Sequence, residues 1–211
     1  MDNYYLTSMS NEEWKESEAE HYASTKPFDM KMRLKNIKDA KKVFDDNGII
    51  FWICDGTLLG AFREKGFIRW DNETDIDMFE EELLANYDLL KDCFLSCGFI
   101  VRGHNRVRGS KMNIYRGREK ISIRGLYLNP EYKEDTYRMS RSYQYPKTFF
   151  EKFDTISLKG VELRTPYPIK EYIYYVYGPN WKKPMKSKKK CLRDWLKRGV
   201  RRKSKDRRRY G

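Results

Sequence analysis

The chain has 211 residues, of which 39% are hydrophobic and 36% are charged, and its formal net charge is +13. A chain of this length can bury one sizeable core, and this composition excludes a wholly disordered protein. Residues 182–211 contain 16 Lys and Arg but only two Asp and Glu, which predicts a nearly neutral body followed by a strongly basic tail.

Hydrophobic periodicity predicts an alternation of helices and strands along the body. Glycine or proline marks the ends of several of these elements. The predicted elements are an arm or marginal helix at 11–24, a helix at 28–47, a strand at 49–54, a helix at 57–66, a strand at 75–79, a helix at 81–97, antiparallel strands within 99–128, a hairpin at 156–166, a helix at 168–178 and a basic helix at 187–202.

Four Arg-Gly dipeptides fall within or beside the predicted antiparallel strands, beginning at positions 102, 108, 116 and 124. Repeated Arg-Gly can mark an RNA-binding segment. Here β-branched and aromatic residues separate the dipeptides, so we interpret them as strands and their turns.

The cysteines and the hydropathy pattern indicate a reducing compartment. Four cysteines at irregular spacing are too few for a secreted disulfide scaffold, and free thiols explain Cys93 and Cys97 better than a zinc site does. The sequence has no run of about 18 apolar residues and no signal-peptide pattern at its N-terminus. We therefore expect a cytoplasmic protein, free or peripheral to a membrane, with no transmembrane helix.

The stretch DGTLLGAFREKGFIRWDNETDIDMF, residues 55–79, carries the clearest chemistry. Asp75 and Asp77 stand two apart on a predicted strand, so both carboxylates point to one face, and a divalent cation would relieve their repulsion. Hard oxygen ligands without nearby His or Cys favour Mg²⁺ or Mn²⁺. Gly56 and Thr57 precede a predicted helix, whose free N–H groups and dipole attract phosphate.

A strand, a Gly-Thr turn, a helix and then an Asp-x-Asp strand predict an α/β (α+β) fold of the nucleotidyltransferase type, with a mixed sheet flanked by helices. We expect three parts in this chain. An N-terminal arm or marginal helix occupies 1–27, the nucleotidyltransferase-like domain occupies 28–181, and a basic C-terminal extension occupies 182–211.

GTLLGAFREKGFIRWDNETDIDMF resembles the signature of the LicD and fukutin family of phosphotransferases, and GVELRTPYPIKEYIYYVYGPNWKKP resembles that family's C-terminal element. The two segments bracket most of the body. The resemblance implies a metal-dependent enzyme that moves a phosphate-linked alcohol, such as phosphocholine or ribitol phosphate, from a CDP-linked donor to a glycan or glycolipid.

Matching positions assign roles by resemblance. Donor phosphate would be held by Gly56, Thr57 and Arg63, metal by Asp75 and Asp77, and catalysis would involve Asp71 with both of these carboxylates. The Trp-Asp pair stands about two residues farther from the Asp-x-Asp strand than is usual, which leaves Asp71 and Glu73 as alternative ligands. Trp70 is expected to pack.

The family pattern also implies a third carboxylate on a neighbouring strand. The best local match is Ser122, which is a poor metal ligand, and Glu119 is an alternative carboxylate. Without such a group the site would be catalytically reduced or inactive, because a carboxylate base activates the acceptor hydroxyl.

Two other functions fit the same sequence. One is a catalytically reduced nucleotidyltransferase-fold protein that binds nucleic acid, and the other is a nucleotidyltransferase that acts on RNA. The basic tail allows either an anionic membrane surface or a nucleic acid as its partner.

Overall fold

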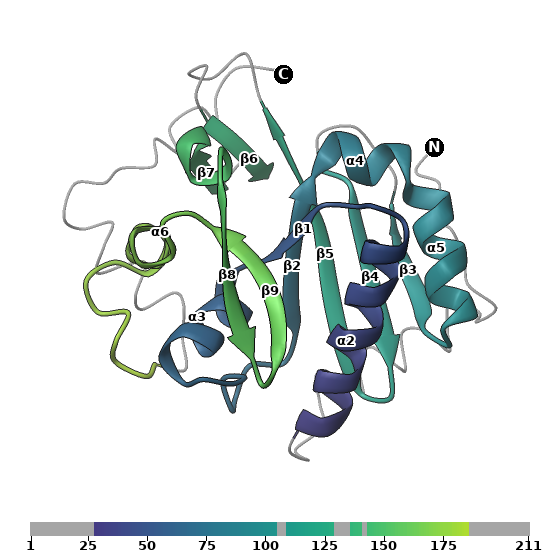
Figure 1. Cartoon of the computed structure of the whole chain (residues 1–211), viewed down its shortest axis with the longest axis horizontal. Helices are drawn as coiled ribbons and strands as arrows, with labels where there is room; N and C mark the ends of the chain where they lie inside the picture. The colour runs from purple at the N-terminus through teal and green to yellow at the C-terminus, as the bar shows by residue number, and fades with distance from the viewer. Residues whose placement is uncertain (1–27, 105–108, 129–135, 141–142, 186–211) are drawn as a thin grey trace, which may run out of the picture.

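The computed structural model describes residues 28–104, 109–128, 136–140 and 143–185, and Figure 1 shows how their elements are arranged. The predicted arm at 11–24 and the predicted basic helix at 187–202 lie outside these residues.

A mixed sheet forms the centre of the structure, as predicted. Its order is β1 (Phe51–Ile53), β2 (Thr74–Phe79), β5 (Glu119–Leu128), β4 (Lys111–Arg116) and β3 (Ile100–His104), and β6 (Thr136–Ser140) and β7 (Tyr143–Pro146) continue from β5. The pair β2 and β5 is parallel, and the other pairs are antiparallel. The parallel pair joins the Asp-x-Asp strand β2 to β5, one of the strands predicted within 99–128. Sequence periodicity alone does not indicate this pairing.

Helices cover the sheet and a separate hairpin lies beside it (Figure 1). These elements are α2 (Met30–Asp46), α3 (Asp55–Arg63), α4 (Glu80–Ala85), α5 (Tyr87–Ser96), η1 (Lys147–Phe150), the hairpin strands β8 (Phe153–Leu158) and β9 (Val161–Pro166), and α6 (Ile169–Tyr177). Helix α2 packs against β5 and α5, and α5 packs against β3.

One part of the core, which includes Trp52 and Leu163, lies on the side of the sheet that β9 covers. A second part lies between the sheet and the helices α2 and α5. Alternate residues of the central strands point into it, including Ile76 and Met78 of β2 and Met112 and Ile114 of β4, and all four are fully buried. The intervening residues of these strands face the other side of the sheet. This alternation places Asp75 and Asp77 on the side opposite α2.

The C-terminal elements of the body confirm their predictions. Lys159 (φ 52°) and Gly160 (φ 82°) form the tight turn between β8 and β9, where positive φ at both positions matches the twist of the strands. Helix α6 begins after Pro168 and ends at Gly178, whose φ is 71°.

The predicted helix at 81–97 is wrong as a single element, because the chain forms α4 and α5 with a break at Asn86. Asn86 leaves helical geometry, and its side chain donates to the carbonyl of Glu82 at 3.0 Å. Asparagine side chains compete in this way with the hydrogen bonds of a helix interior.

Two of the Arg-Gly dipeptides lie inside strands rather than in turns. A Cβ at Gly103 would stand 2.0 Å from the carbonyl oxygen of Lys111, and a Cβ at Gly125 would stand 3.0 Å from Cα of Glu80. These glycines allow close packing. Gly117, at φ 62°, does turn the chain between β4 and β5, as predicted.

No helix in the described ranges is long and apolar enough to cross a membrane. Cys54 is buried, Cys93 is half-buried and Cys97 is exposed, and all three are free thiols.

Candidate active site

Asp75 and Asp77 lie on β2 and are almost completely buried, with 5% and 0% of their surfaces exposed. The parallel register places Asp75 beside Ser122 and Asp77 beside Arg124 of β5. The position expected for a third carboxylate is therefore next to Asp75 but holds a hydroxyl. Two residues farther along, β5 contributes a guanidinium to the same face.

The guanidinium of Arg124 lies among three carboxylates. Its Nε donates to Asp77 Oδ1 at 2.7 Å, and its Nη1 stands 2.9 Å from Asp55 Oδ2 and 3.6 Å from Asp75 Oδ1. Its Nη2 donates to the sulfur of Cys54 at 2.9 Å. The protein therefore supplies one cation to the carboxylates for which the sequence predicted a divalent ion.

Burial governs the electrostatics of this cluster. Burial raises the pKa of Asp77, and it raises that of Asp75 well above its ordinary value, although the neighbouring Arg124 opposes both changes. Burial alone would lower the pKa of Arg124, but Asp77, Cys54 and Asp55 together raise it well above its ordinary value. With all three carboxylates ionised, the cluster has two more negative than positive charges.

Asp55 and Thr57 connect the first turn of α3 to this cluster. Asp55 has φ 42°, a left-handed conformation that non-glycine residues rarely adopt. The hydroxyl of Thr57 accepts a hydrogen bond from the backbone N–H of Asp75 at 2.8 Å. Helix α3 begins at Asp55, so Gly56 and Thr57 form its first turn instead of preceding it.

Gly56 lies against the carboxylate of Asp71. A Cβ at position 56 would stand 1.9 Å from Asp71 Oδ2, so only glycine permits this approach. The carboxylate thus occupies the N-terminal end of α3, where free N–H groups and the helix dipole favour negative charge. Burial raises the pKa of Asp71 to about 6, although Arg33 opposes the shift.

The loop before β2 is held by Arg33 of α2, which is 1% exposed. Its Nη1 donates to the carbonyl of Asp71 at 2.8 Å, and its Nη2 donates to the carbonyl of Glu73. Its Nε stands 3.8 Å from Glu119 Oε2. Glu119 therefore lies on the α2 side of the sheet and does not complete the carboxylate cluster.

Lysines on β4 and β5 add positive charge to the face that carries Asp75. Lys120 forms an ion pair with Glu73 at 2.9 Å. Glu73, which the sequence offered as an alternative metal ligand, is therefore paired with a lysine. Lys111 lies opposite Arg124 in the register of β4 and β5. Burial, followed by repulsion from Lys120, lowers the pKa of Lys111.

Arg63 and Trp70 do not join the cluster. Arg63 lies at the far end of α3, where its Nη1 donates to the carbonyl of Trp181 at 2.9 Å and its Nη2 contacts Glu64. A helix of nine residues separates it from Asp55 by roughly 12 Å. Trp70, which we expected to pack, is 38% exposed.

Tyrosines of β7 and α6 lie near the carboxylates from the other side. Tyr145 and Tyr172 are each 1% exposed, and their rings stack with centroids 5.8 Å apart. Burial raises the pKa of Tyr145 well above its usual value, and Asp55 and Asp77 raise it further. Phe150 contacts both tyrosine rings and also Trp52, which is the register partner of Asp77, so the rings lie on the side of the sheet that carries Asp77.

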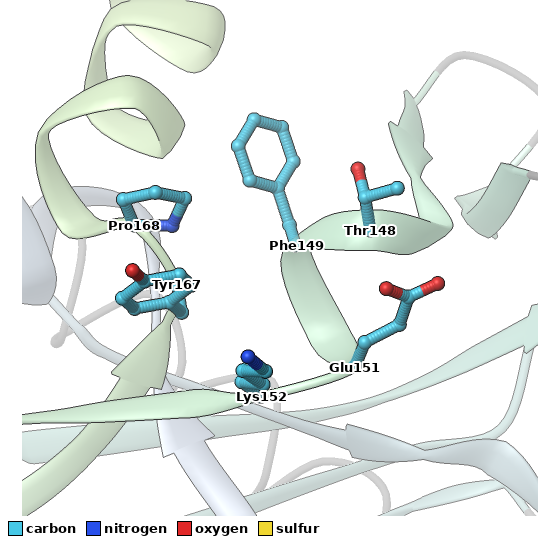
Figure 2. A pocket seen from close by; sticks show the side chains of 6 residues that line it. All are labelled: Thr148, Phe149, Glu151, Lys152, Tyr167 and Pro168. Atoms are coloured by element: carbon cyan, nitrogen blue, oxygen red, sulfur yellow. The ribbon is translucent and has the colours of Figure 1, made fainter.

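A pocket of about 290 Å³ lies between η1 and the start of α6. Figure 2 shows Phe149 on one side of it and Pro168 on the other, with Lys152 below. Its lining consists of Thr148, Phe149, Glu151, Lys152, Tyr167 and Pro168. It shares no residue with the carboxylate cluster.

The carboxylates of β2 fit a single hard divalent ion. Asp77 Oδ2 is buried and has no hydrogen-bond partner. This carboxylate oxygen is the kind of ligand that Mg²⁺ or Mn²⁺ prefers. Within the described ranges, no three His, Cys, Asp or Glu side chains are grouped to hold a metal together. The protein thus offers Asp75 and Asp77, and water or substrate oxygens would complete the shell, as is common for Mg²⁺.

Sequence reasoning missed Asp55, Arg124 and Arg33. Asp55 stands two residues after the buried strand β1, and that position was a usable signal. Arg124 stands two residues after Ser122 on β5, and residues two apart on a strand point to the same face. Placing Ser122 at the site would therefore have placed Arg124 there too. Arg33 gives no local signal, because its partners are about 40 or more residues away.

Replacing Asp71 by Asn should stabilise the protein at neutral pH. The pKa of Asp71 is about 6 in the folded chain, above its ordinary value of 3.8, so folding favours the protonated form. This stabilisation is complete below about pH 4 and is lost as the pH rises through 6. We expect the variant to gain roughly 2 kcal/mol at pH 8 and nothing at pH 4 in urea unfolding.

Asp46, an exposed carboxylate of α2, provides the matched control, and Asp46→Asn should change the free energy of unfolding by less than about 0.5 kcal/mol. A gain for Asp71→Asn that is equal at pH 4 and pH 8 would contradict the burial of its charge.

The mixed sheet, the buried Asp-x-Asp strand and the adjoining strand-to-helix turn define a nucleotidyltransferase-type domain. The sequence matches the family described as LicD/FKTN/FKRP, nucleotidyltransferase domain, over residues 48–168. The chain belongs to this family.

Relatives include the uncharacterized protein RP689 of Rickettsia prowazekii, 26% identical over 155 residues, which are 68% of this chain and 57% of that protein. Ribitol-5-phosphate transferase FKTN of Mus musculus is 26% identical over 153 residues, which are 70% of this chain and 32% of that enzyme. The chain therefore spans only part of the length of each. The solution structure of antibiotic-resistance factor ANT(2'')-Ia has 16% identity and a TM-score of 0.48, covering 81% of this chain and 85% of that one.

Proposed function

We propose that this chain is a metal-dependent transferase that moves a phosphate-linked alcohol, such as phosphocholine or ribitol phosphate, from a CDP-linked donor to a glycan or glycolipid. The observation that carries the proposal is the buried pair Asp75 and Asp77 beside the first turn of α3, inside the segment that matches the family. The relative named as a ribitol-5-phosphate transferase supports the class of reaction.

Asp75 and Asp77 would hold one Mg²⁺ or Mn²⁺ ion in this proposal. Bound there, the ion would neutralise charge on the donor's pyrophosphate and orient it for displacement. Arg124 holds Asp77 through Oδ1 at 2.7 Å, and Asp77 Oδ2, which has no hydrogen-bond partner, would be available to the ion.

The donor's phosphates would lie at the first turn of α3. Gly56 leaves no side chain over the N–H groups of that turn, and Cys54, the N-cap residue, makes no side-chain capping bond. The carboxylate of Asp71 lies against Gly56, and a phosphate bound at this turn would take its place. Lys111, on the face that carries Asp75, would add favourable charge.

Asp71 would then serve the acceptor. Its raised pKa, about 6, suits a group that takes a proton from a hydroxyl near neutral pH. A lipid-linked acceptor would bring the protein to a membrane, and the basic residues 182–211 carry the charge that an anionic surface attracts.

The proposal is tested by thermal shift of the full chain with CDP-choline and CDP-ribitol, with and without Mg²⁺. A true donor at about 100 times its Kd should stabilise the protein by roughly 2.7 kcal/mol, which is about 5–10 °C for a chain of this size. The shift should need Mg²⁺. If no CDP-linked compound shifts the melting temperature, the proposed donor class is wrong.

Gly56→Val should weaken binding of the confirmed donor at least tenfold, about 1.4 kcal/mol. The added Cβ would collide with Asp71 and cover the N–H groups of the turn. Ala85→Val is the control, since Ala85 is exposed at the end of α4 and lies outside the site. A folded Gly56→Val variant that binds normally would place the phosphates elsewhere.

A further inference from the structure

Every nitrogen of the Arg124 guanidinium already has a partner in the protein. Nε is bonded to Asp77, Nη1 lies between Asp55 and Asp75, and Nη2 donates to Cys54. The side chain is 14% exposed, so it has little room to reach a ligand. Its action is therefore directed at the carboxylates.

The charges of the cluster leave room for one divalent ion. Asp55, Asp75 and Asp77 are each at most 5% exposed, and three buried carboxylates repel one another strongly unless cations neutralise them. Arg124 neutralises one of the three charges. The remaining two match one Mg²⁺ or Mn²⁺, and Asp77 Oδ2 is the oxygen left without a hydrogen bond.

Strand β5 contributes a cationic side chain, Arg124, to the face of the sheet on which a third carboxylate was expected. Ser122, beside Asp75, carries no charge, and Arg124 follows it on the same face. Sites that use two metal ions bind them a few ångströms apart among shared carboxylates. Arg124 contacts Asp55, Asp75 and Asp77 at once. With the guanidinium between them, no three carboxylates of the described residues are grouped around a metal position.

We propose that Arg124 is a built-in cation that takes one of the cation positions of the carboxylate cluster, so that the chain binds one divalent ion fewer than it would without Arg124. This inference rests on the proposed function only in taking the cluster to be a metal site. It makes Arg124 a positioning residue that sets the metal content.

The test is a count of bound Mn²⁺ ions by electron paramagnetic resonance on the full chain, in the presence of CDP. We expect one ion in the wild type and two in Arg124→Gln. Arg124→Lys keeps the charge and serves as the control, with the wild-type count. Equal counts in the wild type and Arg124→Gln, whatever their value, would overturn the inference.

The same titration separates this inference from the proposed function. If the wild type binds no ion and Arg124→Gln binds one, the role of Arg124 holds and metal dependence of the proposed transferase fails. If both bind one ion, metal dependence stands and the role of Arg124 is wrong.

Arg124→Gln leaves three buried carboxylates uncompensated, so it could unfold without metal. In that case millimolar Mn²⁺ should restore its circular dichroism spectrum, because an ion that binds only the folded state favours folding. An unfolded variant that millimolar Mn²⁺ does not refold would count against the inference.

Discussion

Transferase activity should fall by at least about 10³-fold when Asp75 and Asp77 are both replaced by Asn, because the proposed metal would lose both of its protein ligands. Mn²⁺ binding should disappear with it. The measurement is turnover of the donor identified by thermal shift, together with calorimetric titration of Mn²⁺ into the same samples.

The fold should survive this double substitution. Asn has the shape of Asp, and burial raises the pKa of both carboxylates, which means that their charged forms oppose folding. Arg124 keeps Asp55 as a partner at 2.9 Å. We therefore expect a melting temperature at pH 7 no lower than that of the wild type.

The exposed pair Asp45 and Asp46 on α2 gives a matched control with the same change of charge. Both carboxylates lie in ion pairs on the surface, and their replacement by Asn should leave activity unchanged. Full activity in the Asp75 and Asp77 double variant would remove these residues from the reaction.

The local elements of the site could be predicted because their signals lie within a few residues. The alternation in DIDMF predicted β2, and the apolar run after Gly48 predicted β1. The Lys159–Gly160 turn was equally clear, because a tight hairpin turn needs positive φ and glycine adopts positive φ easily. Each of these depends on backbone preferences that neighbouring residues determine.

The partners within the site could not be predicted in the same way. Arg124 meets Asp77 only because β5 lies parallel to β2 in one particular register, across 47 residues of sequence. A shift of one residue would turn Arg124 to the α2 side of the sheet. Asp71 illustrates a second limit, since its approach to Gly56 depends on a loop that Arg33 holds.

Two internal charges lie where the charges of the proposed ligands would lie. The carboxylate of Asp71 occupies the N-terminal end of α3, where the donor's phosphate is expected, and the guanidinium of Arg124 lies among the carboxylates, where metal is expected. Both arrangements pair buried charges within the protein. Substrate binding in the proposed reaction would then exchange one set of charge pairs for another.

Arg33→Met should lower the free energy of unfolding by roughly 3–5 kcal/mol. Arg33 donates to the carbonyls of Asp71 and Glu73 and stands 3.8 Å from Glu119 Oε2. Its guanidinium also lies 4.5 Å from the ring centroid of Phe67. Removing it would leave two carbonyl groups without this donor. The buried Glu119 carboxylate would keep the N–H of Asp29 on Oε1 at 2.8 Å but would lose its paired charge.

The measurement is urea unfolding at pH 7, and the melting temperature should fall by about 10 °C or more. Lys38→Met, an exposed change on the same helix, should cost less than about 0.5 kcal/mol. Glu119→Gln combined with Arg33→Met should recover part of the loss, because the second change removes the uncompensated charge. A loss below about 1 kcal/mol for Arg33→Met would mean that the loop before Asp75 holds its shape without Arg33.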